Sequence, residues 1–252
     1  MAVLYRRDGV IARIELDRPA LLNAADEAWV DELDDAAARA ASDDGVHVVI
    51  VSGRGRAFST GIDLTALEEG RIGREWFVGW ERALRRLETM DRIVLAAVHG
   101  YCIGGGLQVA IACDLRIARE DTILGLPAVK ECLIPGLGTY RLPRFIGMGR
   151  AKRMILTGET IGADEALRIG LVDRVAPTDR FEDEVERFAA ELTQVAFASA
   201  VEAKRITGRA FEDGYDDVLG AYLDGQERSM RSPEHAAAMA AWRARRAERE
   251  RR

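Results

Sequence analysis

Three consecutive glycines, residues 104–106, stand where a short apolar run passes into a segment of helix-forming composition. The run at 93–98 is short and β-branched, which is typical of a buried strand, and residues 107–112 favour a helix. A strand that turns through glycines into a helix leaves free backbone N–H groups at the helix start, where the helix dipole favours negative charge. Such a turn can hold a phosphate, a carboxylate or a transient oxyanion. It can equally be a closely packed turn without a ligand.

A second apolar run, residues 46–51, leads into the sequence F-S-T-G-I-D-L at 58–64. Together with H-G-Y-C-I-G-G-G-L at 99–107, this stretch resembles the paired signatures of the crotonase (enoyl-CoA hydratase/isomerase) superfamily. The resemblance extends to D-R-P-A-L-L-N-A at 17–24, I-P-G-L-G at 134–138 and A-D-E-A-L-R-I-G-L-V-D at 163–173. One such motif would be weak. Five in the family's order and spacing make the chain similar to this superfamily over nearly its whole length.

The resemblance implies an α/β fold, a crotonase-like spiral of ββα units with a helical C-terminal region. It implies an acyl-CoA thioester as substrate, so coenzyme A would arrive as part of that substrate and no cofactor would be bound permanently. Family subunits assemble as trimers or as dimers of trimers, so a homotrimer or a dimer of trimers is expected. The family reactions include steps of fatty acid metabolism by lyases and isomerases.

The resemblance also implies two backbone N–H groups that receive the thioester oxygen as it becomes an enolate. Matching motif to motif places them on Ile62 and Gly105. Two fixed dipoles at a developing negative charge stabilise a transition state without reorganising during the reaction. For Asp63, a helix or loop cap is an alternative role that is compatible with ligand binding. The implied coenzyme A contacts are Ala20, Leu21, Leu22, Asn23, Thr60, Gly61, Ile62, Asp63, Leu64, Tyr101, Ile103 and Gly104.

The sequence departs from the family pattern where hydratases carry two glutamates that hold a water and exchange protons with it. One of these positions is Gln108, two residues after the last glycine, and the other is Ala128, directly after Pro127. The spacing from Pro127 to Pro135 matches the family without a gap. Gln108 can hold a water or a carbonyl but cannot exchange a proton near neutral pH, and Ala128 can do neither. The sequence therefore argues against ordinary two-glutamate hydration.

Glu131 is a candidate replacement for the missing acid or base. It stands three residues beyond Ala128, and a helical turn would place both side chains on one face. Because most glutamates are exposed, the alternative is a solvated or salt-bridged surface acid. Cys102 beside the glycine turn could be a catalytic thiol, although core packing is the more common role of such a cysteine. We expect Cys102, Cys113 and Cys132 to be reduced thiols in the core.

Composition narrows the classes of function. The chain has 252 residues, of which 48% are hydrophobic and 31% charged, with a net charge of −6. An acidic balance gives no support to nucleic-acid binding. We find neither a signal-peptide pattern nor an apolar run that could span a bilayer, so we expect a cytoplasmic protein without a membrane partner. No grouping of His, Cys and Asp has metal-ligand spacing, so no metal site is expected.

Alternating patterns predict an α/β core at 1–178, followed by a helical region at 179–252 that would serve oligomerisation and cover the acyl site. The core would begin with a hairpin at 3–16 around Asp8-Gly9 and a helix from about residue 26. We expect a mobile surface loop at 65–74 and a helix at 75–90 whose tryptophans face the core. The remaining expected elements are strands at 115–118, 123–126 and 171–175, a turn after Pro127, and helices at 151–156 and 163–169.

Three readings remain open from the sequence. The first is an acyl-CoA enzyme with an intact oxyanion hole and altered proton transfer; isomerisation, decarboxylation, C–C cleavage and thioester hydrolysis all pass through an oxyanion. The second is a non-catalytic acyl-CoA-binding protein that kept the fold. The third is a scaffold or regulatory subunit of a larger assembly. Acyl-CoA binding without turnover would favour the second, and no binding the third.

Overall fold

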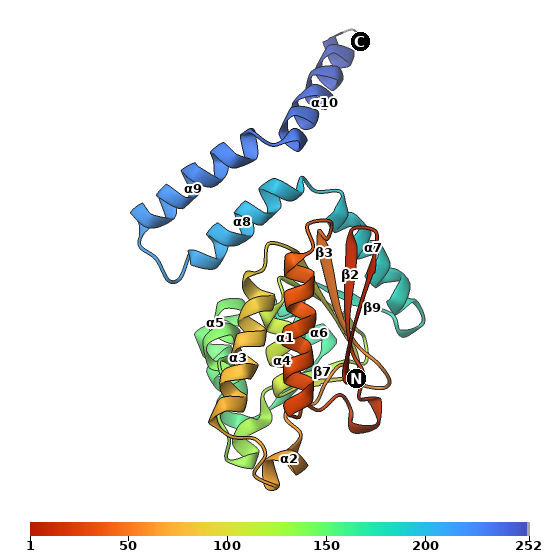
Figure 1. Cartoon of the computed structure of the whole chain (residues 1–252), viewed down its shortest axis with the longest axis vertical. Helices are drawn as coiled ribbons and strands as arrows, with labels where there is room; N and C mark the ends of the chain where they lie inside the picture. Colours follow the sequence, from red (N-terminus) through yellow and green to blue (C-terminus); the bar gives the residue numbers. More distant parts are fainter. Residues whose placement is uncertain (251–252) are drawn as a thin grey trace. The chain divides into compact units, whose positions relative to one another are not determined.

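A six-stranded sheet lies at the centre of residues 1–190 in the computed structural model, which describes residues 1–250 of the chain (Figure 1). The hairpin strands β1 and β2 are antiparallel, and every other neighbouring pair is parallel. Strand β4 is buried along its whole length, as expected of a parallel strand covered on both faces. The strand order is β1 (Val3–Asp8), β2 (Ile11–Leu16), β3 (Val48–Gly53), β4 (Ile93–Val98), β6 (Leu115–Arg119) and β9 (Arg174–Ala176).

A second, three-stranded sheet begins where the chain leaves β4. It contains β5 (Tyr101–Ile103), β7 (Ile123–Gly125) and β8 (Thr160–Gly162), with β5 and β7 parallel and β8 antiparallel to β7. Gly100 makes the bend from β4 into β5 with a φ of +56°, and a Cβ on it would lie 2.1 Å from the carbonyl oxygen of Arg56. Only glycine fits such a bend. Strand, bend, strand and helix α4 (Gly105–Ala112) then form one ββα unit.

Helices α1 (Glu27–Ser42) and α3 (Arg74–Thr89) pack against each other beside the large sheet (Figure 1). Asp26 caps α1 by accepting a hydrogen bond from the Trp29 N–H. The ring of Trp80 stacks on Trp29 at 5.6 Å and on Trp76 at 5.2 Å between centroids. All three tryptophans are buried. The prediction that the tryptophans of the helix at 75–90 belong to the core is confirmed.

Several elements differ from the sequence-based expectations. Residues 65–68, the first part of the loop expected at 65–74, lie in a short helix, α2 (Leu64–Glu68), because Asp63 caps it. The helix expected at 151–156 is the end of α5 (Gly138–Thr157), which is interrupted by non-helical φ/ψ at Gly147. The strand expected at 171–175 is the shorter β9. Strands β5 and β8 were not predicted, since three residues are too few to show a period.

The hairpin, the helix after residue 26 and the turn after Pro127 agree with the expectations. That turn is a 3₁₀ helix, η2 (Pro127–Glu131), and helix α6 (Ala163–Arg168) occupies the other predicted position. Gly170 follows α6 with a φ of +80°, as expected of a residue that ends a helix. The remaining 3₁₀ helices are η1 (Pro19–Leu21) and η3 (Thr178–Arg180).

The chain divides into two compact units, residues 1–190 and 191–252. Helix α7 (Phe181–Thr193) begins in the first unit, where its apolar face is buried. Within the second unit, α8 (Phe197–Arg209) packs on α9 (Tyr215–Met230), and the guanidinium of Arg228 forms two 2.8 Å hydrogen bonds with the carboxylate of Glu202. Helix α10 (Pro233–Glu250) follows.

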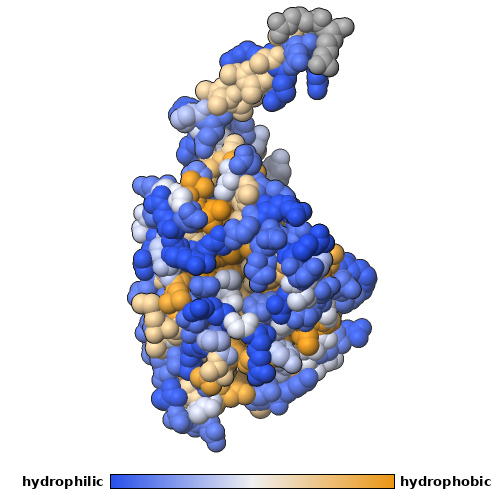
Figure 2. Space-filling model, turned by 90° about the vertical axis from the view of Figure 1, so that its right-hand side faces the viewer, coloured by the Kyte–Doolittle hydropathy of each residue, from blue (hydrophilic) through white to orange (hydrophobic). Residues whose placement is uncertain are grey.

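Charged and polar residues cover most of the face drawn in Figure 2, with smaller apolar patches between them. In the described part of the chain, none of the helices combines the length and the apolarity needed to cross a bilayer. Large apolar side chains are nevertheless exposed on the second unit, among them Phe211, Tyr215 and Trp242.

Candidate active site

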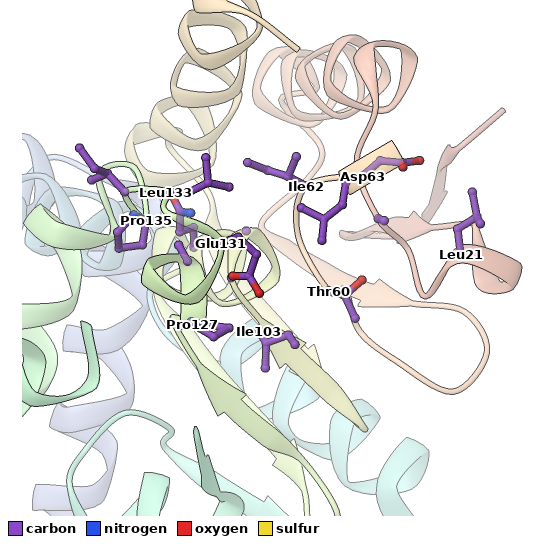
Figure 3. A pocket seen from close by; sticks show the side chains of 16 residues that line it. Leu21, Thr60, Ile62, Asp63, Ile103, Pro127, Glu131, Leu133 and Pro135 are labelled. Atoms are coloured by element: carbon purple, nitrogen blue, oxygen red, sulfur yellow. The ribbon is translucent and has the colours of Figure 1, made fainter. Parts of the chain in front are cut away.

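A cavity of about 350 Å³ opens beside the N-terminus of α4 (Figure 3). Its wall combines four segments: the η1 region, the loop before α2, the β5–α4 turn, and η2 with the loop that follows it. The lining residues are Leu21, Ala24, Thr60, Ile62, Asp63, Leu64, Ile103, Gly104, Gly105, Gln108, Pro127, Ala128, Glu131, Leu133, Ile134 and Pro135. Most are apolar or contribute backbone, which is typical of a site for a small organic ligand with a few placed polar groups.

The two predicted N–H donors, on Ile62 and Gly105, both lie at this cavity. Gly105 is the first residue of α4, so its N–H has no partner inside the helix. Among residues 1–250, no hydrogen bond is found for the N–H of either residue. Gly61 brings them together: its φ is +93°, and a Cβ on it would lie 2.3 Å from the Gly105 nitrogen. The loop before α2 therefore lies directly against the helix start.

The ring of Trp80 supports this contact from behind. A Cβ on Gly105 would lie 3.0 Å from two carbons of the Trp80 ring and 2.9 Å from the Gly61 Cα. The neighbouring Ile62 is held by a parallel bridge to Ala25, in which the Ala25 N–H donates to Gly61 and the Asp63 N–H donates to Ala25. Both predicted donors are thus fixed by backbone packing rather than by side-chain hydrogen bonds.

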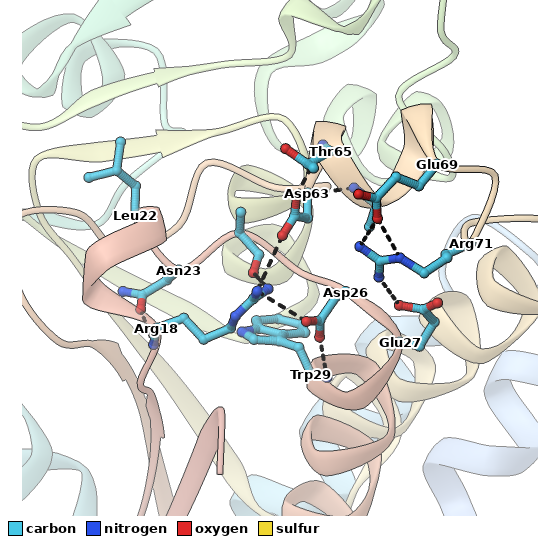
Figure 4. A network of polar contacts seen from close by, with 12 residues as sticks. Arg18, Leu22, Asn23, Asp26, Glu27, Trp29, Asp63, Thr65, Glu69 and Arg71 are labelled. Carbon is cyan, nitrogen blue, oxygen red and sulfur yellow. Dashed lines mark hydrogen bonds and ion pairs between the residues drawn. The ribbon is translucent and has the colours of Figure 1, made fainter.

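Asp63 is a helix cap, as the sequence alternative proposed. Its Oδ1 accepts hydrogen bonds from the N–H groups of Thr65 and Ala66 at 3.1 and 3.3 Å. Its Oδ2 lies 3.2 Å from the guanidinium of Arg18, which also pairs with Asp26 at 3.0 Å (Figure 4). Further along, Arg71 joins Glu69 and Glu27. These ion pairs attach α2 and the turn after it to α1.

Asn23 lies in the interior next to the cavity but does not line it. Its Nδ2 lies within 3.0 Å of the carbonyl oxygens of Arg54, Ala57 and Phe58, and its Oδ1 accepts from the Arg18 N–H at 2.8 Å. The side chain is fully buried. The amide of Asn23 thus joins the segment 17–24 to residues 54–58 by hydrogen bonds.

We expect Asn23→Ala to lower the free energy of unfolding by about 2–4 kcal/mol, because two buried carbonyl groups and one partly buried one would lose their donor. The measurement is equilibrium denaturation in urea. Leu22→Ala is the matched control, since Leu22 has a similar left-handed φ of 52° and a side chain without polar groups. An equal effect of both substitutions would mean that the amide contributes little.

The two glutamate positions of the family pattern both face the cavity. Gln108 lies one turn beyond Gly105 and is 5% exposed, and its Oε1 has no hydrogen-bond partner in the described part of the chain. Ala128 lines the cavity from η2. Glu131 stands one 3₁₀ turn further on the same face, as the spacing predicted. Figure 3 shows its carboxylate directed into the cavity, on the side of Ile103.

The other predicted contacts fall into two groups. Leu21, Thr60, Ile62, Asp63, Leu64, Ile103 and Gly104 line the cavity, and Gly61 lies directly behind it. Ala20, Leu22, Asn23 and Tyr101 do not line it, and the Tyr101 side chain is 42% exposed. Sequence reasoning did not single out the apolar wall formed by Leu133, Ile134 and Pro135, although the I-P-G-L-G motif marked its position.

The remaining candidate groups are structural. Cys102 is buried, and burial raises the pKa of its thiol, so it packs in the core and is a poor nucleophile. Burial also lowers the pKa of His99, whose Nε2 lies 3.0 Å from the Gly55 carbonyl oxygen. The three cysteines are free, but Cys132 is exposed at the end of η2, so the expectation of a core thiol was wrong there. Residues 1–250 contain no cluster of three or more potential metal ligands.

Comparisons with known proteins agree with this architecture. The family model described as Enoyl-CoA hydratase/isomerase matches residues 6–248. The chain is 34% identical over 221 residues to the short-chain-enoyl-CoA hydratase of Clostridium acetobutylicum, covering 86% of this chain and 85% of that protein. It is 30% identical over 226 residues to the crotonyl-CoA hydratase of Syntrophomonas wolfei, covering 88% and 87%.

Solved structures show the same likeness. The crystal structure of an enoyl-CoA hydratase from Bacillus anthracis superposes with a TM-score of 0.90 at 28% identity, and that of Mycobacterium smegmatis with 0.92 at 26%. Each comparison covers 97% of both chains. The crotonase-like fold class inferred from the sequence is therefore confirmed, and the chain belongs to the enoyl-CoA hydratase/isomerase family.

Proposed function

We propose that this protein is an acyl-CoA thioester-processing enzyme in which the N–H groups of Ile62 and Gly105 stabilise an enolate oxyanion. The observation that carries the proposal is the contact of Gly61 with Gly105, which holds two unused N–H groups at the edge of one cavity. Donors fixed before the reaction lower the energy of a transition state that develops negative charge on oxygen. The family membership supports a CoA thioester as the source of that oxygen.

The second half of the proposal is that proton transfer differs from that of a two-glutamate hydratase. Neither Gln108 nor Ala128 can exchange a proton near neutral pH. Reactions that pass through an oxyanion and can dispense with the paired glutamates, such as isomerisation, decarboxylation, C–C cleavage or thioester hydrolysis, fit the site better. The acyl chain would lie along the apolar wall of Leu133, Ile134 and Pro135, and the nucleotide would pass over the segments around Leu21 and Asp63.

The test is hydration of crotonyl-CoA by the purified protein, followed as loss of enoyl-thioester absorbance, with acyl-CoA binding measured on the same sample. We expect binding with slow hydration, and turnover of another acyl-CoA in a substrate panel. Fast hydration would contradict the altered proton transfer. Failure to bind any acyl-CoA would contradict the whole proposal.

A second candidate function is non-catalytic acyl-CoA binding. The replacement of both glutamate positions by groups that do not titrate favours it. Binding without turnover across the panel would identify this function.

In either case we propose a homotrimer or a dimer of trimers, which light scattering of the purified protein would test.

Glu131 is our proposed acid or base, because it lines the cavity one turn from Ala128 and its carboxylate is directed inward. Glu131→Gln keeps the shape of the side chain and removes proton transfer, so we expect kcat to fall roughly 10²–10⁴-fold. Glu159→Gln, which alters an acid outside the cavity, is the control. Full turnover by Glu131→Gln would remove Glu131 from the mechanism.

A further inference from the structure

A buried arginine lies in α5, the helix that follows the loop carrying the apolar wall of the cavity. The Arg141 side chain on α5 is 2% exposed and pairs with Glu81 at 2.8 Å and with Glu88 at 3.3 Å, both on α3. These two glutamates are not equivalent. Glu81 also accepts a hydrogen bond from the Leu137 N–H at 2.9 Å through its Oε1, so it is attached to the loop that carries the cavity wall.

Gly136 in this loop leaves room for two oxygens to approach each other. Its φ is +45°, and a Cβ on it would lie 2.6 Å from Gln108 Oε1 and 3.0 Å from Glu81 Oε1. The two oxygens are therefore separated by no more than about two hydrogen-bond lengths. Any larger residue at 136 would fill the space between them.

Both oxygens are hydrogen-bond acceptors. The Glu81 carboxylate already accepts hydrogen bonds from Arg141 and from the Leu137 N–H. Gln108 Oε1 is buried and has no partner within residues 1–250. An orphaned buried acceptor beside a carboxylate is unfavourable unless a donor lies between them. A single water molecule has the two O–H groups that this pair of acceptors requires.

We propose that Glu81 is a positioning residue of the acyl-CoA site. Glu81 and Gln108 bind one water molecule at Gly136, and this shared donor fixes the orientation in which Gln108 presents its carboxamide to the acyl chain. The inference rests on the proposed function, since it assigns the cavity beside Gln108 to an acyl group.

The test is a double-mutant cycle on binding of crotonyl-CoA, measured by calorimetry with the full chain. The variants are Glu81→Met, Gln108→Met and the double substitution, in which methionine keeps side-chain length and removes the acceptors. Glu88→Met is the matched control, because it removes the other partner of Arg141 at a distance from Gly136. Glu81→Met and Glu88→Met are expected to lower the melting temperature similarly, so stability alone does not separate them.

We expect Glu81→Met and Gln108→Met each to raise Kd roughly tenfold, the effect of one lost hydrogen bond, and the double variant to bind no more weakly than either. The fold-changes in Kd caused by Glu88→Met and by Gln108→Met should instead multiply when the two substitutions are combined. Gly136→Ala, which removes none of the partners of Arg141 but places a methyl group against both oxygens, should reproduce the effect of Glu81→Met and serves if the double variant does not fold. The inference is overturned, while the proposed function stands, if Glu81→Met leaves Kd unchanged. It is also overturned if the fold-changes in Kd of Glu81→Met and Gln108→Met multiply in the double variant. Failure of the unmodified protein to bind overturns both.

Discussion

Gly61→Ala is expected to reduce kcat for the acyl-CoA substrate roughly 10²–10³-fold, which is the usual effect of losing one oxyanion donor. The methyl group would lie 2.3 Å from the Gly105 nitrogen, so the loop and the helix start must move apart. At a φ of +93° any L side chain is also strained. Substrate binding should change far less than turnover, because the oxyanion develops only during the reaction.

Gly9→Ala is the matched control for this experiment. Gly9 also has a positive φ, +58°, but no atom lies within 4 Å of the position of its Cβ. It therefore reproduces the backbone strain without the clash, and its kcat should equal that of the unmodified protein. Steady-state kinetics and the melting temperature of both variants separate loss of the oxyanion hole from loss of fold. If both variants retained full kcat, the N–H groups would not stabilise the transition state.

The double substitution Gln108→Glu with Ala128→Glu is expected to raise hydration of crotonyl-CoA roughly 10²–10⁴-fold above the unmodified protein. Both positions line the same cavity as the proposed oxyanion donors, so the two carboxylates would face a water held next to the acyl chain. Two carboxylates at one site repel each other, and the pKa of one of them would rise. Hydration by the variant should therefore depend on pH in the acidic to neutral range.

Loss of enoyl-thioester absorbance measures the gain. The control is Gln108→Glu with Ala128→Gln, which has the same bulk and one carboxylate fewer, and its rate should stay near that of the unmodified protein. An unmodified protein that already hydrates crotonyl-CoA as fast as the double variant would show that the site does not need the two glutamates.

The sequence predicted the fold well, because long elements have strong periods. The buried run that forms β4 and the amphipathic segment that forms α3 are examples. The five motifs indicated the family fold into which these elements pack. Strand β5 was missed, since it consists of three residues between two glycine turns. Helix α2 was missed because it depends on the cap at Asp63 and on the ion pairs of Arg18 and Arg71, which join segments far apart in the chain.

The candidate site was predicted in part. The positions of Ile62, Gly105, Gln108 and Ala128 around one cavity follow from the motifs. The contribution of Glu81 could not be foreseen, because its neighbour Trp80 is a core residue and its helical spacing is that of a surface position. Its significance arises from contacts with Arg141, Leu137 and the space at Gly136, all more than fifty residues away in the sequence. The sequence pattern around a residue does not reveal such long-range contacts.

The contact of Gly61 with Gly105 has a consequence for how this site can change over evolutionary time. The proposed anion-stabilising half consists of main-chain groups held by two glycines, so side-chain drift at Ile62 leaves it in place. The proton-transferring half consists of side chains, and single-nucleotide changes separate glutamate codons from those of glutamine and alanine. The main-chain donors therefore persist through substitution, whereas the side chains that transfer protons are replaced easily. Such a scaffold can acquire new reactions on the same class of substrate.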